Sequence, residues 1–402
     1  MIQPLSDITV IDASSYISGP FCTKYLADMG ATGIKVESPR GGDVSRRLSP
    51  FYNDTPSSDG SGVFLFMNAN KQGITLDLET DTGRDIFLEL VAKADVLVED
   101  FHPGFLASRG IGYAELSAIN EQLVMTSVTP FGQTGPYSEM TGEELVLLGM
   151  GGPMLHTGND NREPTKYAGN IALRQGGVLA ALATSVAITA MDLRGTGEHV
   201  DVSLFEVLAG SQDRRTSLML AHQHVQEVFG RRAVGGTIAS GIFPCQDGYV
   251  NISGGGVRFE GVCRMIGQPE LLDDERFSPS ERLLEENAVV FNVLFLEEWL
   301  SDKTMLEVWQ AAQKEHVLAG VIYTTKDLLD NQDFKDRGVW QEIDHPSTGP
   351  VMYPGRPYIM SESPWSMRRH APQLGQDNDE IYCGMLGYSR EDLVTLYQSG
   401  VI

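Results

Sequence analysis

Two β-branched runs near the start, Ile8-Thr9-Val10-Ile11-Asp12 and Gly33-Ile34-Lys35-Val36-Glu37, decide the fold of this chain. Each run has the length and apolar content of a buried strand. Between them, Pro20 opens a helical pattern that Gly30 closes. Strand, helix and strand within about 35 residues form a βαβ unit, which predicts a parallel sheet covered by helices.

The same alternation continues beyond this unit. Further strands are expected over 73–78, 95–99, 123–127 and 198–203, with helices over 82–93, 113–120 and 176–193. Strands that alternate with helices are typical of doubly wound α/β folds. We therefore expect residues 1–205 to form a large α/β domain around a parallel sheet.

The character of the chain changes after Leu204. A long helical stretch is expected to residue 229, a Gly-rich segment over 230–241, a strand over 248–253, and acidic, mostly helical chain over 273–335. These features indicate a second and smaller unit. Residues 346–357 hold four prolines and two glycines, which predicts an extended crossing segment.

Composition and charge narrow the classes of function. The 402 residues include 30 Lys and Arg against 54 Asp and Glu, a formal net charge of −24. Such a surface repels phosphate backbones and anionic lipid, so we expect neither nucleic acid nor membrane as a partner. The N-terminus shows no secretory pattern, and the longest apolar run, 176–191, is shorter than the ~20 residues of a bilayer span. A cytoplasmic protein is predicted.

The four cysteines indicate neither a disulfide framework nor a metal site. Cys22, Cys245, Cys263 and Cys383 lie far apart, and no Cys-x-x-Cys pair occurs. This pattern is typical of reduced thiols in a cytosolic protein. No metal is expected.

A basic cluster stands out in this acidic chain. Its members flank the predicted strands: Arg40, Arg46, Arg47, Lys71 and Arg109. Ligands of parallel sheets collect at the carboxyl ends of strands, so these loops could form a positive rim for a phosphorylated ligand. Scattered surface arginines in salt bridges remain the alternative. Phe101 and Pro103 could supply an apolar shelf for an aromatic base.

The order of short motifs resembles that of one known family. The motifs are Ser18-Gly19-Pro20, Leu26-Ala27-Asp28-Met29-Gly30-Ala31, Gly41-Gly42-Asp43, Asn70-Lys71, Phe101-His102-Pro103-Gly104, Phe131-Gly132-Gln133-Thr134-Gly135-Pro136 and Arg194-Gly195-Thr196-Gly197-Glu198. Together they resemble the family III acyl-CoA transferases, the formyl-CoA and carnitine-CoA transferase type, with their α-methylacyl-CoA racemase relatives. The resemblance runs nearly end to end.

This resemblance implies an architecture and an assembly. It implies a large Rossmann-like CoA-binding domain from 1–205 and 336–402, with a linker helix and small α+β domain over 206–335. It also implies interlocked dimers, in which each chain passes through a ring formed by the other. Coenzyme A would enter as part of an acyl-CoA substrate, with a carboxylic acid as second substrate and no tightly bound cofactor.

The resemblance also implies which residues would contact CoA. They are Ser18, Gly19, Arg40, Lys71, Asp100, Phe101, His102, Gly104 and Arg109. Relatives usually carry an arginine at the position of Ser108, one residue before Arg109. Gly235 and Gly236 fall where relatives place a Gly-rich loop over the active site; a lid and a plain interdomain linker are the two interpretations.

The family nucleophile is absent from its expected position. In the family, an aspartate attacks the donor thioester, nine residues after a proline and four before a glycine. Here Pro164 and Gly177 place that position at Leu173, whose side chain has no lone pair to offer. The racemase branch needs a histidine as well, and its position falls at Glu143 beside Glu144.

Three hypotheses follow. The chain is a CoA-transferase subunit without a nucleophile, paired with a homologous catalytic subunit, an arrangement that resembles the two-subunit benzylsuccinate CoA-transferases. Alternatively it is a competent CoA-transferase or acyl-CoA isomerase that uses another carboxylate, with Glu143, Glu144 or Glu163 as candidates. The third is a non-catalytic CoA-binding protein.

Overall fold

The computed structural model describes residues 3–158, 162–210 and 237–402, which divide into two compact units. The larger unit holds the described residues of 3–153, 166–210 and 335–402. The smaller unit holds those of 154–165 and 237–334. The expected domain bounds, 1–205 with 336–402 and 206–335, stay a prediction.

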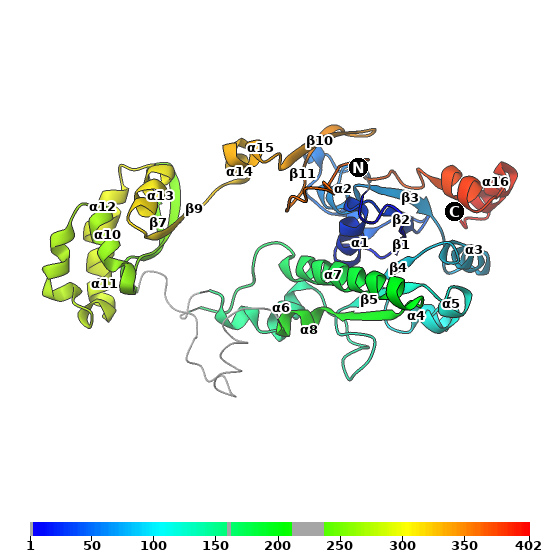
Figure 1. Ribbon diagram of the computed structural model, residues 1–402, viewed down its shortest axis with the longest axis horizontal. Coiled ribbons are helices and arrows are strands. Elements are labelled where there is room, and N and C mark those ends of the chain that lie inside the picture. The colour runs from blue at the N-terminus through cyan, green and yellow to red at the C-terminus, as the bar shows by residue number, and fades with distance from the viewer. Residues whose placement is uncertain (1–2, 159–161, 211–236) are drawn as a thin grey trace. The chain divides into compact units, whose positions relative to one another are not determined.

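A six-stranded parallel sheet organises the larger unit (Figure 1). Its strands are β1 (Thr9–Ala13), β2 (Thr32–Glu37), β3 (Lys71–Thr75), β4 (Val96–Glu99), β5 (Val124–Thr129) and β6 (His199–Ser203). The spatial order β3-β2-β1-β4-β5-β6 is that of a Rossmann-like doubly wound sheet. The predicted α/β class with a parallel sheet is confirmed.

Helices connect and cover these strands. They are α1 (Ser18–Asp28), α2 (Gly62–Asn68), α3 (Asp81–Val91), α4 (Phe105–Ser108), α5 (Tyr113–Ile119), α6 (Glu144–Met150), α7 (Ile171–Arg194), α8 (Leu204–Ala209) and α16 (Arg390–Gln398). Helix α7 packs closely on α1, where a Cβ on Gly177 would lie 2.6 Å from the Ser18 carbonyl oxygen. Only glycine allows this approach.

Helix α7 is the one helix of the described residues that is long and apolar enough to cross a bilayer. It packs against α1 and β5 instead, and one of its faces is buried in the larger unit. Its length and composition are therefore those of a core helix in this fold.

The C-terminal segment belongs to the same core. Ile381, Leu393 and Ile402 are buried in the cluster that holds the sheet residues Ile34 and Leu97. The buried Tyr382 hydroxyl donates to the Thr75 carbonyl oxygen at 2.6 Å. These contacts tie a segment from the end of the chain to the β3 edge of the sheet.

The proline-rich segment forms a hairpin. Strand β11 (Gly349–Pro354) pairs antiparallel with β10 (Trp340–His345), so part of the segment 346–357 is extended as expected but belongs to a hairpin. Alternation along β11 buries Tyr353, which packs with Phe64 and Ala371. The prolines of this segment do not prevent pairing, because a two-stranded ribbon leaves one edge of each strand without a partner strand.

The smaller unit is built on a three-stranded antiparallel sheet. Its strands are β7 (Ser240–Cys245), β8 (Gly248–Ser253) and β9 (Leu318–Val321). Its helices include α10 (Phe259–Met265), α11 (Glu285–Phe291), α12 (Glu297–Leu300), α13 (Met305–Lys314) and α14 (Thr325–Asp330). Helix α15 (Gln332–Asp336) follows α14 along the chain. Phe259, Phe277 and Phe291 pack against one another in its core with their rings tilted or edge to face. The predicted α+β character is confirmed, with β9 an unexpected strand within 273–335.

Candidate functional site

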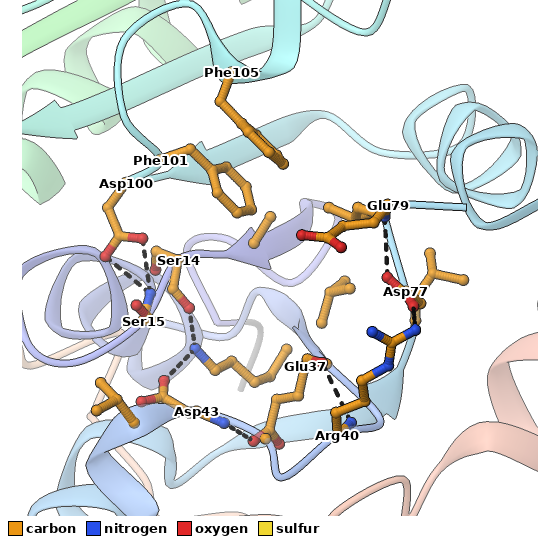
Figure 2. Close-up of a pocket in the computed structure, with 18 of the residues that line it drawn as sticks. Ser14, Ser15, Glu37, Arg40, Asp43, Asp77, Glu79, Asp100, Phe101 and Phe105 are labelled. Carbon is orange, nitrogen blue, oxygen red and sulfur yellow. Dashed lines mark hydrogen bonds and ion pairs between the residues drawn. The ribbon is translucent and has the colours of Figure 1, made fainter. Parts of the chain in front are cut away.

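A cavity of about 490 Å³ opens at the carboxyl ends of β1 to β4 (Figure 2). Four loops build it, because parallel strands bring their following loops to one edge of the sheet. The polar and aromatic lining residues are Ser14, Ser15, Lys35, Glu37, Ser38, Arg40, Asp43, Arg47, Asp77, Glu79, Asp100, Phe101 and Phe105. A Rossmann-like sheet binds ligands at this place, where the strand order reverses.

Lys35, a buried lysine on β2, lines the cavity. The Lys35 ammonium lies 2.8 Å from Asp43 Oδ2, donates to the Ser14 carbonyl oxygen and lies 3.8 Å from Asp12 Oδ1. Its pKa is raised, because these carboxylates outweigh the cost of burial. Lys35 stays charged and joins the loops after β1 and β2.

Lys71, expected to contact CoA, is fully buried beneath the cavity and does not line it. Its ammonium donates to Asp12 Oδ2 at 2.7 Å, to the Pro20 carbonyl oxygen and to Asn68 Oδ1, both at 2.9 Å. Burial lowers its pKa to about 8. Because all three donors have partners, Lys71 positions the loop between β1 and α1 and has none left for a ligand.

The basic cluster divides into two sets. Arg40 and Arg47 line the cavity, and Arg40 Nη2 lies 3.0 Å from Asp77 Oδ2. Arg109 lies at its edge, stacked on Phe105 at 5.5 Å from the ring centroid. Arg46, in contrast, is 1% exposed and binds Glu37, so the salt-bridge alternative holds for this residue.

Asp100 and two phenylalanines form the opposite wall from Arg40 (Figure 2). Both Asp100 carboxylate oxygens accept from the Ser15 N–H, at 2.9 and 2.8 Å. Burial raises the pKa of Asp100 well above its usual value. The rings of Phe101 and Phe105 stack with centroids 4.8 Å apart, which provides an apolar surface for a planar base.

Other residues expected to contact CoA lie outside the lining. Ser18 Oγ donates to the Leu173 carbonyl oxygen at 2.9 Å. A Cβ on Gly19, in the first turn of α1, would lie 2.2 Å from Ser14 Cβ, so glycine is required for the helix to lie this close to Ser14. His102 is exposed, and Gly104 has a φ of 81° just before α4.

Leu173 lies in the first turn of α7 and is 5% exposed. Glu144 Oε1 accepts from the Ala172 N–H and its Oε2 from the Leu173 N–H, each at 3.1 Å. Three carboxylates were expected as alternative nucleophiles. In the described part of the chain, only Glu144 among them forms a hydrogen bond with this turn, and Glu143 and Glu163 are exposed. Gly235 and Gly236 lie outside the described residues.

Asp12 and Lys35 are structural site residues that sequence reasoning missed. Both lie within the strands quoted first, and both side chains are fully buried. A charged side chain inside an otherwise apolar buried strand needs an oppositely charged partner. The presence of Asp12 and Lys35 in such strands was therefore the sequence signal that could have identified them. Phe105 was missed because only the tertiary stack with Phe101 shows its place. No His, Cys, Asp and Glu group among the described residues could hold a metal ion.

The sheet order and the position of the cavity define a Rossmann-like α/β protein with a cavity at the carboxyl ends of its strands. Comparison with known families is more specific. The sequence model of CoA-transferase family III matches residues 5–378, and the chain belongs to this family. The resemblance drawn from the motifs is confirmed.

Curated relatives and solved structures agree with this assignment. The chain is 32% identical to the succinyl-CoA:(R)-benzylsuccinate CoA-transferase subunit BbsE of Thauera aromatica, over 98% of each chain. It is 31% identical to the succinyl-CoA–D-citramalate CoA-transferase of Chloroflexus aurantiacus, over 100% of this chain and 98% of that one. A crystal structure of a CAIB/BAIF family protein from Brucella suis superposes with a TM-score of 0.84 at 30% identity, covering 96% of this chain and 100% of that chain.

Proposed function

We propose that this chain is the nucleophile-deficient subunit of a heteromeric CoA-transferase. The enzyme moves CoA from an acyl-CoA thioester to a free carboxylic acid, and a homologous partner subunit carries the aspartate that does the covalent chemistry. The relative BbsE, itself named as a subunit, supports a heteromeric assembly. The observation that carries the proposal is a buried leucine, Leu173, in the first turn of α7 where the family aspartate is expected.

The chemistry assigned to the partner needs a carboxylate. Its oxygen attacks the donor thioester carbonyl, the C–S bond breaks, and CoA leaves as a thiolate while a mixed anhydride forms. The thiolate then attacks the enzyme's acyl carbon, releasing the donor acid and leaving an enzyme-bound thioester. The acceptor carboxylate repeats these two steps in reverse order, which yields the new acyl-CoA and the free enzyme carboxylate. A leucine can perform none of these steps.

This chain contributes a CoA site in the proposal. Arg40, Arg47 and, at the edge, Arg109 offer positive charge to the CoA phosphates, while Phe101 and Phe105 receive the adenine base. The lining carboxylates Glu37, Asp43 and Asp77 are each paired with a basic side chain. Their negative charge is thereby offset, which keeps the cavity compatible with an anionic ligand. Because Arg40 is the partner of Asp77, a phosphate would share its guanidinium with that carboxylate.

We extend the proposal to the assembly of the protein. The large domain comprises 1–205 and 336–402, the small domain 206–335, and the chains interlock as dimers. The enzyme works in the cytoplasm. Four free cysteines fit a reducing compartment.

The decisive experiment compares the chain alone with the chain co-purified with homologous subunits that retain the aspartate. Succinyl-CoA is the donor, and acyl-CoA products of candidate acids are measured by mass spectrometry. We expect no transfer by this chain alone and transfer by the pair. Leu173→Ala in this chain should preserve the activity of the pair, whereas asparagine in place of the partner's aspartate should abolish it. Transfer by this chain alone would overturn the proposal.

A second function has one specific observation in its favour. Glu144 places a carboxylate against the N–H groups of the first turn of α7, so it is the candidate nucleophile of a self-sufficient enzyme. Hydroxylamine treatment after exposure to succinyl-CoA would then form a hydroxamate at Glu144. Glu144→Gln should remove that label and Glu143→Gln should keep it; an unlabelled wild-type chain contradicts this second function.

A further inference from the structure

His345 is a buried histidine whose ring is held between two backbone groups. It is the last residue of β10 and is 3% exposed. The Ser347 N–H donates to its Nδ1 at 3.2 Å, and its Nε2 lies 3.1 Å from the Ala371 carbonyl oxygen. A backbone N–H can only donate and a carbonyl oxygen can only accept, so Nδ1 is unprotonated and Nε2 carries the hydrogen. The His345 ring is therefore neutral.

A second histidine contacts the same carbonyl oxygen. His370 Nδ1 donates to the Ala371 carbonyl oxygen at 2.7 Å, and the two histidine rings meet edge to face with centroids 4.9 Å apart. His370 keeps this bond when it gains a proton, because the nitrogen involved already donates. Two positive charges at this separation inside the protein would repel each other. His370 can thus be charged only at the expense of a charge on His345.

The surroundings of His345 favour its neutral form. Burial lowers its pKa, and His370 and Arg46 lower it further, while Asp59 and the bond to Ala371 oppose them. The Asp59 carboxylate is already engaged, because Oδ1 lies 3.0 Å from Arg46 Nη1 and Oδ2 accepts from the Ser347 hydroxyl at 2.9 Å. Within the described part of the chain, no carboxylate forms an ion pair with His345. A proton on this ring would therefore lack a counter-charge in direct contact.

The two bonds of His345 join the β10–β11 hairpin to the rest of the larger unit. His345 lies at the turn of the hairpin, where it pairs with Gly349 of β11. Ala371 lies in a segment beside the edge of the parallel sheet, because the carbonyl oxygen of Arg369 accepts from the Asn70 N–H directly before β3. His345 is therefore a direct link between the hairpin and the segment that lies along β3.

We propose that His345 is an acid-sensitive latch that holds the β10–β11 hairpin on the larger unit. When neutral, the ring accepts from Ser347 in the hairpin turn and donates to Ala371 outside the hairpin. When protonated, its Nδ1–H faces the Ser347 N–H, so two buried donors meet without an acceptor. The hairpin then separates from the segment beside β3. The latch goes beyond the proposed function and does not depend on it.

Release of the hairpin and protonation of His345 are linked. The released hairpin exposes a histidine with an ordinary pKa of ~6.5, whereas the docked hairpin holds the ring neutral. The released form therefore binds more protons in acid, and the docked form is favoured above about pH 6.5 and loses that advantage as the pH falls. Between about pH 7.5 and about pH 5.5, the ratio of docked to released hairpin should fall roughly tenfold.

Hydrogen exchange of the full-length protein tests the latch. An isolated two-stranded hairpin is marginally stable in water, so release exposes the amides of β10 and β11. Mass spectrometry at about pH 7.5 and about pH 5.5 gives their protection factors, corrected for the intrinsic pH dependence of amide exchange. We expect a roughly tenfold loss of protection in β10 and β11 at the lower pH. Peptides from β1 and β5, inside the parallel sheet, should keep their protection.

Two variants separate His345 from the other titrating groups. His345→Gln cannot gain a proton, so its hairpin protection should be the same at both pH values. His316→Asn is the matched control, because His316 is exposed in the smaller unit and asparagine tolerates its positive φ of 57°. This control should show the pH dependence of wild type.

Hairpin protection in wild type that is equal at the two pH values overturns the latch. An equal loss of protection in wild type and His345→Gln overturns it as well, and so does a simultaneous loss in β1 and β5, which is general acid unfolding. Should His345→Gln fail to fold, NMR of wild type with ¹⁵N-labelled histidine decides, because it shows which ring nitrogens carry a hydrogen. A charged His345 in a hairpin that stays protected overturns the proposal; a charge that appears together with the loss of protection supports it.

Discussion

At the scale of single residues, the ionisation of Asp100 changes the charge of the cavity at the carboxyl ends of β1 to β4. Burial raises the pKa of its carboxyl, so the group stays protonated to a higher pH than the ~3.9 of a free side chain. As the pH rises through the shifted pKa, ionisation adds a negative charge beside an anionic ligand. CoA affinity should therefore fall with increasing pH.

Asp100→Asn tests this expectation. Calorimetric titration of CoA over a series of pH values that spans the raised pKa should show a loss of roughly tenfold in affinity for wild type as Asp100 ionises, the size expected for one charge at a partly screened site. Asparagine keeps an oxygen that accepts from the Ser15 N–H but cannot ionise, so the variant should show only the pH dependence of CoA itself. Identical profiles for both proteins would refute the role of Asp100.

The buried charges around Asp12 act on stability. Asp12 faces both Lys35 and Lys71, which lower its pKa against the opposing effect of burial. Asp12→Asn removes a negative charge that faces two buried ammonium groups. We therefore expect the free energy of unfolding, measured by urea denaturation, to fall by about 3–5 kcal/mol. Asp85→Asn, in the exposed pair with Arg84, should cost under about 1 kcal/mol. Similar losses in the two variants would contradict the structural role.

At the scale of elements, a carboxylate on α6 caps the start of α7. Asn170, the N-cap residue of α7, makes no side-chain capping bond. Instead, the Glu144 carboxylate accepts hydrogen bonds from the N–H groups of Ala172 and Leu173. A carboxylate at a helix N-terminus also interacts favourably with the helix dipole. The helix that carries Leu173 is thereby anchored to its neighbour.

Removing this cap should destabilise the larger unit. We expect Glu144→Ala to lower the free energy of unfolding by about 2 kcal/mol, since two N–H groups at a buried helix end lose their acceptor. Glu144→Gln, which retains one acceptor, should lose less. The exposed neighbour supplies the control, because Glu143→Ala leaves both bonds in place. Urea denaturation followed by circular dichroism measures all three, and an unchanged midpoint for Glu144→Ala would exclude the capping role.

At the scale of the whole molecule, the smaller unit has a core of its own. Phe259, Phe277 and Phe291 stand at its centre, together with buried aliphatic residues from its sheet and helices. A domain with its own core can fold without the rest of the chain. We expect a fragment of residues 237–334 to give dispersed amide NMR signals and a cooperative thermal transition; a collapsed spectrum without a transition would show that it depends on the larger unit.

The sequence by itself determined the α/β class, the parallel sheet and the family. Strand and helix periodicity is local, so the runs at 8–12 and 33–37 predict β1 and β2 to within a residue. The order of the motifs was also readable along the chain, as was the leucine at position 173. Local patterns determine these features because no distant partner is needed to produce them.

Only the tertiary structure decided which charged residues line the cavity and which are buried in ion pairs. Arg40 and Arg46 lie six residues apart, yet one lines a cavity while the other is buried against Glu37. Lys71 was expected at the ligand and proved to be a buried link between loops. Burial and ion pairing depend on residues far apart in the chain, and so do the contacts of the Arg174 guanidinium with the rings of Phe21 and Phe66. A side chain's chemistry is set by these neighbours, which the linear order of residues does not specify.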